Sequence, residues 1–210
     1  MNLIDLTQTI RPGLPVYPGD EKVQLEQVKN IDNDGYTNFR LSSEMHSGTH
    51  VDGPLHLISG EMKMSELRPE QFAGKGVLID VRGEKLIALR ESFTDLVLPE
   101  TIILFYSGFD QYFDKPEYFT AHPVISDELA VFLGEQKVKM IGIDWPSPDH
   151  HPYPIHQILL KNNILILENL TGLGHLVHES DFEVFAFPLK IDADSALVRV
   201  IARVCRPEPI

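Results

Sequence analysis

Cysteine is almost absent from this sequence. Among 210 residues there is one, Cys205, so the chain offers no pair of cysteines for an internal disulfide. This excludes the class of small secreted proteins that depend on disulfides, and we expect a protein of the reducing cytoplasm. With 43% hydrophobic residues, a chain of this length buries a sizeable core without covalent cross-links.

Long apolar runs are also lacking. Runs such as Ile164 to Leu167 are far shorter than the roughly 20 residues that a membrane-spanning helix needs. The first residues, Met-Asn-Leu-Ile-Asp-Leu-Thr, contain no basic segment followed by a long apolar stretch, so we expect no signal peptide. Both absences predict a cytoplasmic protein without a membrane partner.

Basic residues are outnumbered, with 18 Lys and Arg against 31 Asp and Glu, for a net charge of −13. Such a chain repels phosphate backbones, and no cluster of Lys or Arg interrupts the pattern, so we expect no nucleic acid among its partners. Histidine is more informative than charge. The chain has nine, and six of them fall in two short windows, 46–56 and 150–156.

The pattern along the chain predicts one domain, residues 1–210, because no internal repeat and no long Pro-, Gly- or Ser-rich linker divides it. Many short strands and few helices predict an α/β or α+β fold. The expected helices are 126–135 and 155–161, a rigid loop occupies 11–20, and the expected strands are 2–8, 37–45, 76–81, 101–106, 140–143, 164–167, 183–189 and 196–204.

Four potential metal-binding or acid–base side chains fall within eleven residues, His46-Ser-Gly-Thr-His-Val-Asp-Gly-Pro-Leu-His56. All four are at even positions, which share one face of a strand. In a straight strand His46 and His50 would be roughly 13 Å apart, at about 3.3 Å per residue, whereas ligands lie within about 2 Å of their ion. The two histidines share an ion only if the chain bends, and Gly48 permits the bend.

Asp52 is on the same face as His50, and its carboxylate suits one ion or a bridge between two. Pro54 breaks the strand and redirects His56 toward the cluster. A helix would also bring residues four apart together, but the Ser-Gly-Thr and Gly-Pro sequences disfavour helix. A single buried histidine more often bonds to the backbone than to a metal. Two histidines and an aspartate on one face are harder to explain in that way, since Asp is rarely buried without a partner.

A second group of polar residues follows the strand expected at 140–143. Pro154 suits the first turn of a helix and places His156 in that turn, where the positive helix end predicts a neutral imidazole able to bind a metal. Glu168 directly follows an apolar strand, where a carboxylate needs a partner or a metal. We expect His150 and His151 on the solvent side of the loop.

The segment 46–56 resembles the signature His-x-Gly-Thr-His-x-Asp-x-Pro-x-His of the cyclase family, which includes bacterial-type kynurenine formamidase. The resemblance extends over nearly the whole chain. The further segments that resemble the family are Tyr17-Pro-Gly-Asp20, Ser107-Gly108, Asp144 to Asp149, and His156 with Glu168-Asn169-Leu170.

The resemblance implies an α/β fold of the swivelling β/β/α type, a single domain with a mixed, barrel-like β core and flanking helices. It also implies a site for two zinc ions. In that site His46 and His50 would hold one ion and His156 the other. Asp52 and Glu168 would bridge the two ions. His56 would be the proton donor and acceptor.

Three residues depart from the family pattern: Tyr17 replaces the Trp of the formamidases, Ser107 a Thr, and Gly53 an Ala. The metal set is intact, so the departures bear on the substrate and not on hydrolysis. The resemblance implies a small-molecule amide, an aryl formamide such as N-formyl-kynurenine, with Tyr17 lining its pocket. It further implies a homodimer or larger homo-oligomer.

Three other readings fit the same residues. Some relatives open a cyclic amide with one manganese ion. A non-heme iron oxygenase also uses two histidines and a carboxylate, but Glu168 and a third histidine favour two divalent ions and hydrolysis. A non-catalytic metal-binding or small-molecule-binding protein would have no need of His56, which is present.

Overall fold

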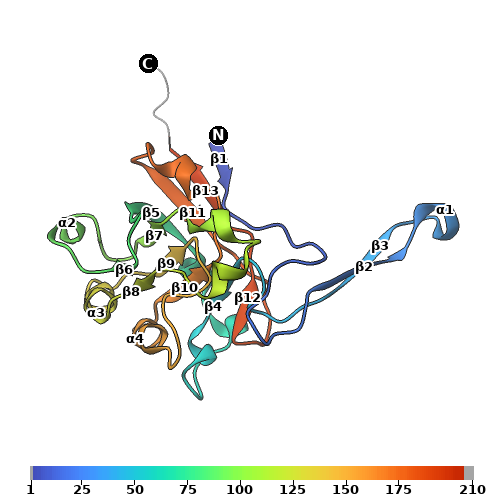
Figure 1. Cartoon of the computed structure of the whole chain (residues 1–210), viewed down its shortest axis with the longest axis horizontal. Helices are drawn as coiled ribbons and strands as arrows, with labels where there is room; N and C mark the ends of the chain where they lie inside the picture. The colour runs from blue at the N-terminus through green and yellow to red at the C-terminus, as the bar shows by residue number, and fades with distance from the viewer. Residues whose placement is uncertain (1, 206–210) are drawn as a thin grey trace.

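The computed structural model describes residues 2–205, and a strongly curled, mixed sheet of nine strands forms their centre (Figure 1). Strands from the beginning, middle and end of the chain are neighbours in this one sheet. In spatial order the strands are β1 (Asn2–Asp5), β13 (Ile201–Val204), β11 (Phe182–Phe185), β5 (Ala73–Asp80), β7 (Ile102–Tyr106), β9 (Met140–Ile143), β10 (Leu165–Glu168), β4 (His50–Asp52) and β12 (Ser195–Leu197).

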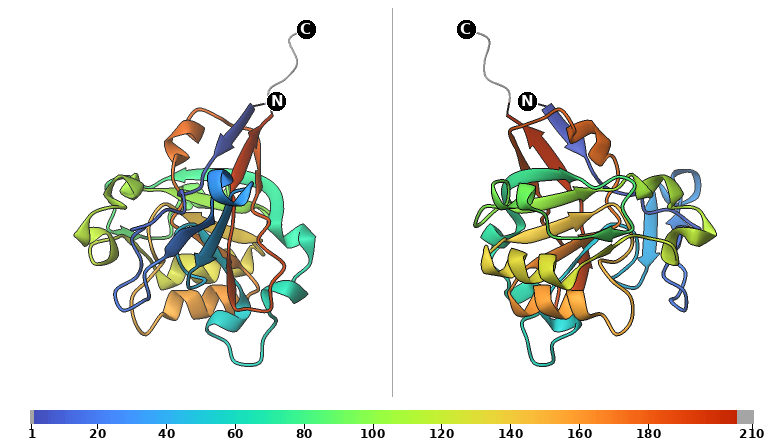
Figure 2. Two further views of the ribbon diagram at one scale, coloured as in Figure 1. Left: turned by 90° about the vertical axis from the view of Figure 1, so that its right-hand side faces the viewer. Right: turned by 60° about the vertical axis from the view of Figure 1, so that its left-hand side comes forward.

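The middle of the sheet, from β5 through β7 and β9 to β10, is parallel. Parallel strands are covered on both faces, which is why these segments are almost continuously apolar. Helices α3 (Asp127–Glu135) and α4 (Pro154–Lys161) lie along one face (Figure 2). Ile103 and Phe105 of β7 point into the core under those helices, and Ile102 and Leu104 point to the opposite side.

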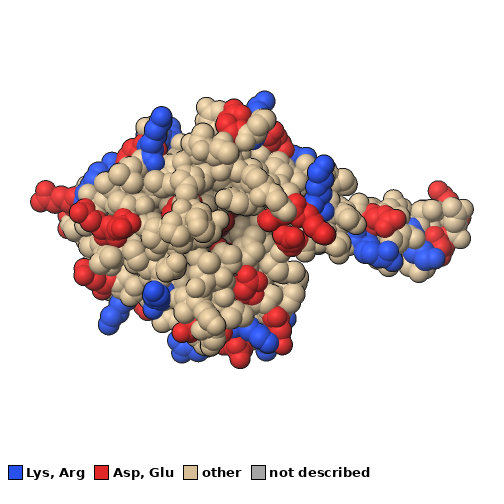
Figure 3. Space-filling view, turned by 60° about the horizontal axis from the view of Figure 1, so that its bottom comes forward, with Lys and Arg blue, Asp and Glu red and all other residues tan. Residues whose placement is uncertain are grey.

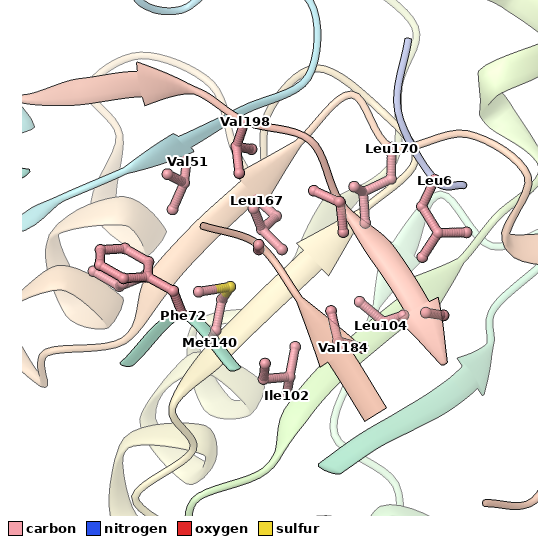
Figure 4. Packing of buried hydrophobic residues seen from close by; sticks show 14 of the residues in the cluster. Leu6, Val51, Phe72, Ile102, Leu104, Met140, Leu167, Leu170, Val184 and Val198 are labelled. Atoms are coloured by element: carbon pink, nitrogen blue, oxygen red, sulfur yellow. The ribbon is translucent and has the colours of Figure 1, made fainter. Parts of the chain in front are cut away.

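The opposite face of the sheet curls over a second core. Figure 4 shows Leu104, Met140 and Leu167 from the parallel strands directed toward Val184 of β11 and Val198. Because the sheet closes partly on itself, residues from its two ends share this core. The strands predicted at 76–81, 101–106, 140–143 and 164–167 and the helices at 126–135 and 155–161 are confirmed to within a few residues.

The single strand predicted at 196–204 is wrong. The segment is two strands, β12 and β13, which pair at opposite sides of the curled sheet, β12 with β4 and β13 with β1 and β11. The chain crosses between them at Val200, which bonds to Leu6 and Thr7 near the N-terminus. The apolar alternation was nonetheless informative, since Val198, Val200, Ala202 and Val204 are all buried.

A two-stranded arm projects from the body (Figures 1 and 2). It consists of β2 (Gln24–Lys29), the short helix α1 (Ile31–Asp34) and β3 (Asn38–Ser42), and within residues 2–205 its two strands pair only with each other. Figure 3 shows charged side chains of both signs on the arm. The sequence predicted the β3 strand but not its partner, nor its separation from the main sheet. Every residue of β3 is exposed.

The remaining elements are short. A parallel pair, β6 (Leu86–Ile87) and β8 (Val124–Ile125), lies apart from the main sheet with helix α2 (Glu91–Thr94). No helix within residues 2–205 has the length and hydrophobicity to span a bilayer. The 3-10 helices are η1 (Pro54–His56), η2 (Met64–Glu66), η3 (Pro69–Phe72), η4 (Phe109–Tyr112), η5 (Pro116–Phe119) and η6 (Leu173–Leu176).

Candidate metal centre

Strand β4 carries two of the predicted site residues, His50 and Asp52, and its neighbour β10 brings a third, Glu168, beside them. β4 lies between β10 and β12 and is antiparallel to both. In this register His50 is directly opposite Glu168, and Asp52 is opposite Ser195. Residues opposite each other in an antiparallel pair have their side chains on the same face. The sheet therefore holds the imidazole of His50 beside the carboxylate of Glu168.

Gly48 forms the bend that the sequence predicted before β4. Its φ of +61° is a left-handed conformation that glycine adopts at little cost, and a Cβ there would lie 3.0 Å from Ile10 and 3.1 Å from Leu14. The bend lets His46 fold back toward the strand, so that its Nδ1 is 2.9 Å from Asp52 Oδ1. The ring centroids of His46 and His50 are 5.0 Å apart.

His156 enters the cluster from the first turn of α4. Asp149 accepts hydrogen bonds from the backbone N–H groups of Ile155 and His156, at 2.6 and 3.2 Å, and thereby satisfies this helix end. Its other oxygen is 2.6 Å from Nδ1 of His156. With Nδ1 held in this way, the second ring nitrogen, Nε2, faces Asp52 and Glu168.

The carboxylates of Asp52 and Glu168 each have one oxygen near His50 and the other near His156. Oδ1 of Asp52 lies near His46 and His50, and its Oδ2 is 3.7 Å from His156 Nε2. Oε2 of Glu168 is 3.3 Å from His50 Nε2, and its Oε1 is 3.3 Å from His156 Nε2. Carboxylates arranged in this way are suited to bridging two cations.

Several buried polar atoms of this cluster have no hydrogen-bond partner among the described residues. They are Nε2 of His50, both oxygens of Asp52 and Oε1 of Glu168. Asp52 is 0% exposed and Glu168 is 6% exposed. Burying carboxylate oxygens without partners is costly unless a cation compensates. The nitrogen and oxygen donors that converge here are those that Zn²⁺ binds, so the residues fit a metal.

The electrostatics of the cluster lead to the same interpretation. Burial lowers the pKa of His46, but the carboxylates of Asp52 and Asp194 outweigh it and raise that pKa to about 10. Burial likewise disfavours the charged form of His50, whereas Asp52 and Glu168 raise its pKa to about 9. Burial raises the pKa of Asp52, but the histidines hold it well below its usual range. The carboxylates thus attract positive charge, either as protons on the histidines or as a bound cation.

The prediction that the helix end keeps His156 neutral is wrong for the protein without a cation. Burial does favour its neutral form. The hydrogen bond to Asp149 and the nearby carboxylates of Asp52 and Glu168 outweigh burial, so the pKa of His156 lies well above its usual value. Three nearby carboxylates act more strongly than the partial charge of one helix terminus.

His56 reaches the cluster from η1, which begins at Pro54, the residue at which the sequence predicted that the strand breaks. Its ring centroid is 4.1 Å from that of His46 and 5.8 Å from that of His156. One ligand atom from each of His46, Asp52 and His56 lies within 4.8 Å of the others. His56 is therefore near enough either to bind an ion or to transfer a proton beside one.

Asp194 is part of the cluster although no sequence pattern identified it. Its Oδ2 is 3.0 Å from Nε2 of His46 and 3.2 Å from Nδ1 of His56. Hydrogen bonds from His46 and His56 outweigh its partial burial and lower its pKa. Asp194 is far from both histidines in the chain, and only the pairing of β12 with β4 brings it near them.

A cavity of about 230 Å³ opens onto the cluster. Its outer wall is aromatic, with Tyr17 and Phe119 edge to face at 5.9 Å between centroids and Tyr153 beside them. Tyr17 is 37% exposed. The structure thus places Tyr17 in the same cavity as the histidine–carboxylate cluster. His150 and His151 are exposed, as predicted, and do not line this cavity.

Comparison with known proteins identifies the family. The model described as "Putative cyclase" matches residues 4–150. The chain belongs to the cyclase family. Kynurenine formamidase of Erythrobacter litoralis is 34% identical over 205 residues, which is 95% of this chain and 92% of that one. Kynurenine formamidase of Bacillus cereus is 32% identical over 207 residues, 95% and 96% of the two chains.

Solved structures show that the curled mixed sheet is a fold of this family. Isatin hydrolase A from Labrenzia aggregata, bound to benzyl benzoate, superposes with a TM-score of 0.85 at 24% identity, over 97% of this chain and 93% of that chain. Isatin hydrolase A from Ralstonia solanacearum gives 0.83 at 24% identity, over 96% and 91%. The family and the fold implied by the sequence resemblance are confirmed.

We expect Asp52→Asn to remove most of the bound metal. The amide lacks the negative charge that offsets a bound cation and has one acceptor oxygen instead of two. Zinc per chain, measured by elemental analysis after purification in zinc-containing buffer, checks this. Asp127→Asn on the exposed surface of α3 is the matched control and should retain its zinc. Full zinc content in Asp52→Asn would contradict a site centred on Asp52.

Proposed function

We propose that this cyclase-family protein is a metal-dependent amide hydrolase that acts on an aryl formamide such as N-formyl-kynurenine, releasing formate and the free amine. The observation that carries the proposal is a single cavity in which a buried histidine–carboxylate cluster, an additional imidazole and an aromatic wall meet. The relatives named kynurenine formamidase, at 32–34% identity over nearly the whole chain, support this substrate class.

Two divalent ions fit the geometry best. One ion would be held by His46 and His50 and the other by His156. Asp52 and Glu168, whose oxygens face the histidines on both sides, would contribute to holding both ions. The imidazole and carboxylate donors favour zinc, and manganese is the second candidate. Such ions lower the pKa of water toward neutrality and polarise a carbonyl oxygen.

His56 is suited to proton transfer. Amide hydrolysis needs a proton on the departing nitrogen, because an amide anion is a very poor leaving group. The His56 ring is partly exposed in the cavity, and Asp194 contacts its Nδ1. Its Nε2 then remains to accept a proton from water and pass it to the leaving nitrogen.

The aromatic wall supports an aryl substrate. Tyr17 and Phe119 present an edge-to-face pair at the mouth of the cavity, and Tyr153 and Leu57 complete the apolar lining. An aromatic ring that enters this space stacks against existing rings and displaces water. The amide carbon would then point inward, toward the carboxylates and histidines.

Formate release from N-formyl-kynurenine by the zinc-loaded protein tests the proposal directly. Isatin is tested as a second substrate, since opening of its ring would favour the cyclic-amide alternative. For that alternative the solved structures of isatin hydrolases offer similarity of fold alone. Oxygen uptake with added iron would favour the oxygenase alternative. A zinc- or manganese-loaded protein that hydrolyses no amide would refute the proposal.

We expect His56→Ala to retain most of its metal and to lose about 10²–10⁴-fold in kcat, the range for a positioned acid or base. Metal content and steady-state kinetics of the same preparation give both quantities. His150→Ala removes an exposed histidine outside the cavity and should leave both unchanged. Loss of metal as severe as that of His50→Ala would show that His56 is a ligand.

We expect Tyr17→Ala to raise KM for aryl formamides more than for aliphatic formamides, with metal content unchanged. Tyr17 contacts Phe119 in the cavity wall, and within residues 2–205 its ring makes no aromatic contact with the histidines of the cluster. The measurement is the ratio of kcat/KM for the two substrate types. Tyr112→Ala, a similarly exposed tyrosine outside this cavity, is the control. An equal loss for both substrates would contradict the pocket assignment.

A further inference from the structure

One carboxylate oxygen contacts two histidines that have different roles in the proposed function. Asp194 Oδ2 lies 3.0 Å from Nε2 of His46 and 3.2 Å from Nδ1 of His56. A carboxylate accepts hydrogen bonds and does not donate them. Both ring nitrogens that face Asp194 must therefore carry hydrogen, which fixes which nitrogen of each ring is left to act.

For His46 the remaining nitrogen is Nδ1, which is 2.9 Å from Asp52 Oδ1. Without a cation this nitrogen also carries hydrogen and the ring is protonated; with a cation bound it would be the nitrogen that binds. A metal-binding histidine commonly donates its other N–H to a carboxylate, which orients the ring and makes it a better donor. For His56 the remaining nitrogen is Nε2, free to exchange a proton with substrate or water. The same aspartate thus sets the tautomer of both rings.

The backbone holds Asp194 firmly in this position. Its carbonyl accepts the N–H of Gly53, the residue after Asp52, at 2.9 Å, and Ser195 Oγ donates to the carbonyl of Val51 at 2.8 Å. A Cβ on residue 53 would lie 3.0 Å from the Asp194 carbonyl oxygen and 2.7 Å from Met64. Gly53 therefore permits the close approach of the Asp194 segment.

We propose that Asp194 is a positioning residue that couples metal binding to proton transfer, by holding His46 in its metal-binding tautomer and His56 in its proton-transferring tautomer. This inference rests on the proposed function of the same site. It assigns Asp194 no contact with substrate. Its effect passes through the two imidazoles.

Two readouts that do not need activity test this role in the zinc-loaded protein. The first is zinc affinity, measured by competition with a chelator, and the second is the ring ¹⁵N NMR spectrum, which distinguishes the two tautomers of each histidine. We expect Asp194→Ala to weaken zinc binding about 10- to 100-fold, the usual effect of losing such a partner. We also expect it to turn His56 from the Nδ1–H form into a mixture.

Two further variants separate the hydrogen bonds of Asp194 from its negative charge and from the general effect of removing an acidic residue from this segment. Asp194→Asn keeps an oxygen that can accept both bonds, so we expect it to restore the His56 tautomer and part of the zinc affinity. Asp192→Ala removes an acidic residue two positions away, which contacts Ser65 and Lys63, and should change neither readout. Wild-type zinc affinity together with an unchanged His56 tautomer in Asp194→Ala would overturn the proposal, even if N-formyl-kynurenine proves not to be the substrate.

Discussion

The pairing of β4 with β10 on one side and β12 on the other is the constraint on which the site depends. The antiparallel register with β10 sets His50 against Glu168, and the register with β12 brings Asp194 beside the residues that follow Asp52. A shift of either pairing by one residue would turn these side chains to the opposite face of the sheet. β4 is short and fully buried. A shift by one residue would turn the apolar side chain of Val51 out of the core, so the burial of Val51 selects the observed register.

The site places charged groups where the rest of the fold is apolar. Asp52 and Glu168 are at the edge of a core in which neighbouring strand residues such as Val51 and Leu167 are 0% exposed. Carboxylates in such a place raise the energy of the folded chain unless positive charge accompanies them. The three histidines nearest to them provide that charge when protonated, and a divalent cation provides it when bound. The core therefore tolerates the cluster in both conditions.

Local features of this structure were predictable from the sequence, and pairings between distant segments were not. The bend at Gly48, the start of α4 at Pro154 and the buried strands at the centre of the sheet follow from residue types and short-range periodicity, although the parallel direction of those strands does not. The division of 196–204 into β12 and β13 does not, because the alternation of apolar residues is the same whichever strands they pair with. Asp194 was missed for that reason: its nearest sequence neighbours carry no motif. Without a cation the expected neutral form of His156 fails because the carboxylate of Asp149, seven residues before it, and those of Asp52 and Glu168 raise its pKa.

Protons and cations compete for the same charges in this cluster, and this sets the sign of its pH dependence. The pKa values of His46 and His50 are raised to about 10 and about 9, so without a cation their protonated forms stabilise the fold below the ordinary histidine pKa near 6.5. That stabilisation is lost as the pH rises through about 9 to 10. A bound cation needs neutral imidazoles, so its affinity increases over the same rise in pH. The fold accordingly exchanges one source of positive charge for the other, and the buried carboxylates remain compensated throughout.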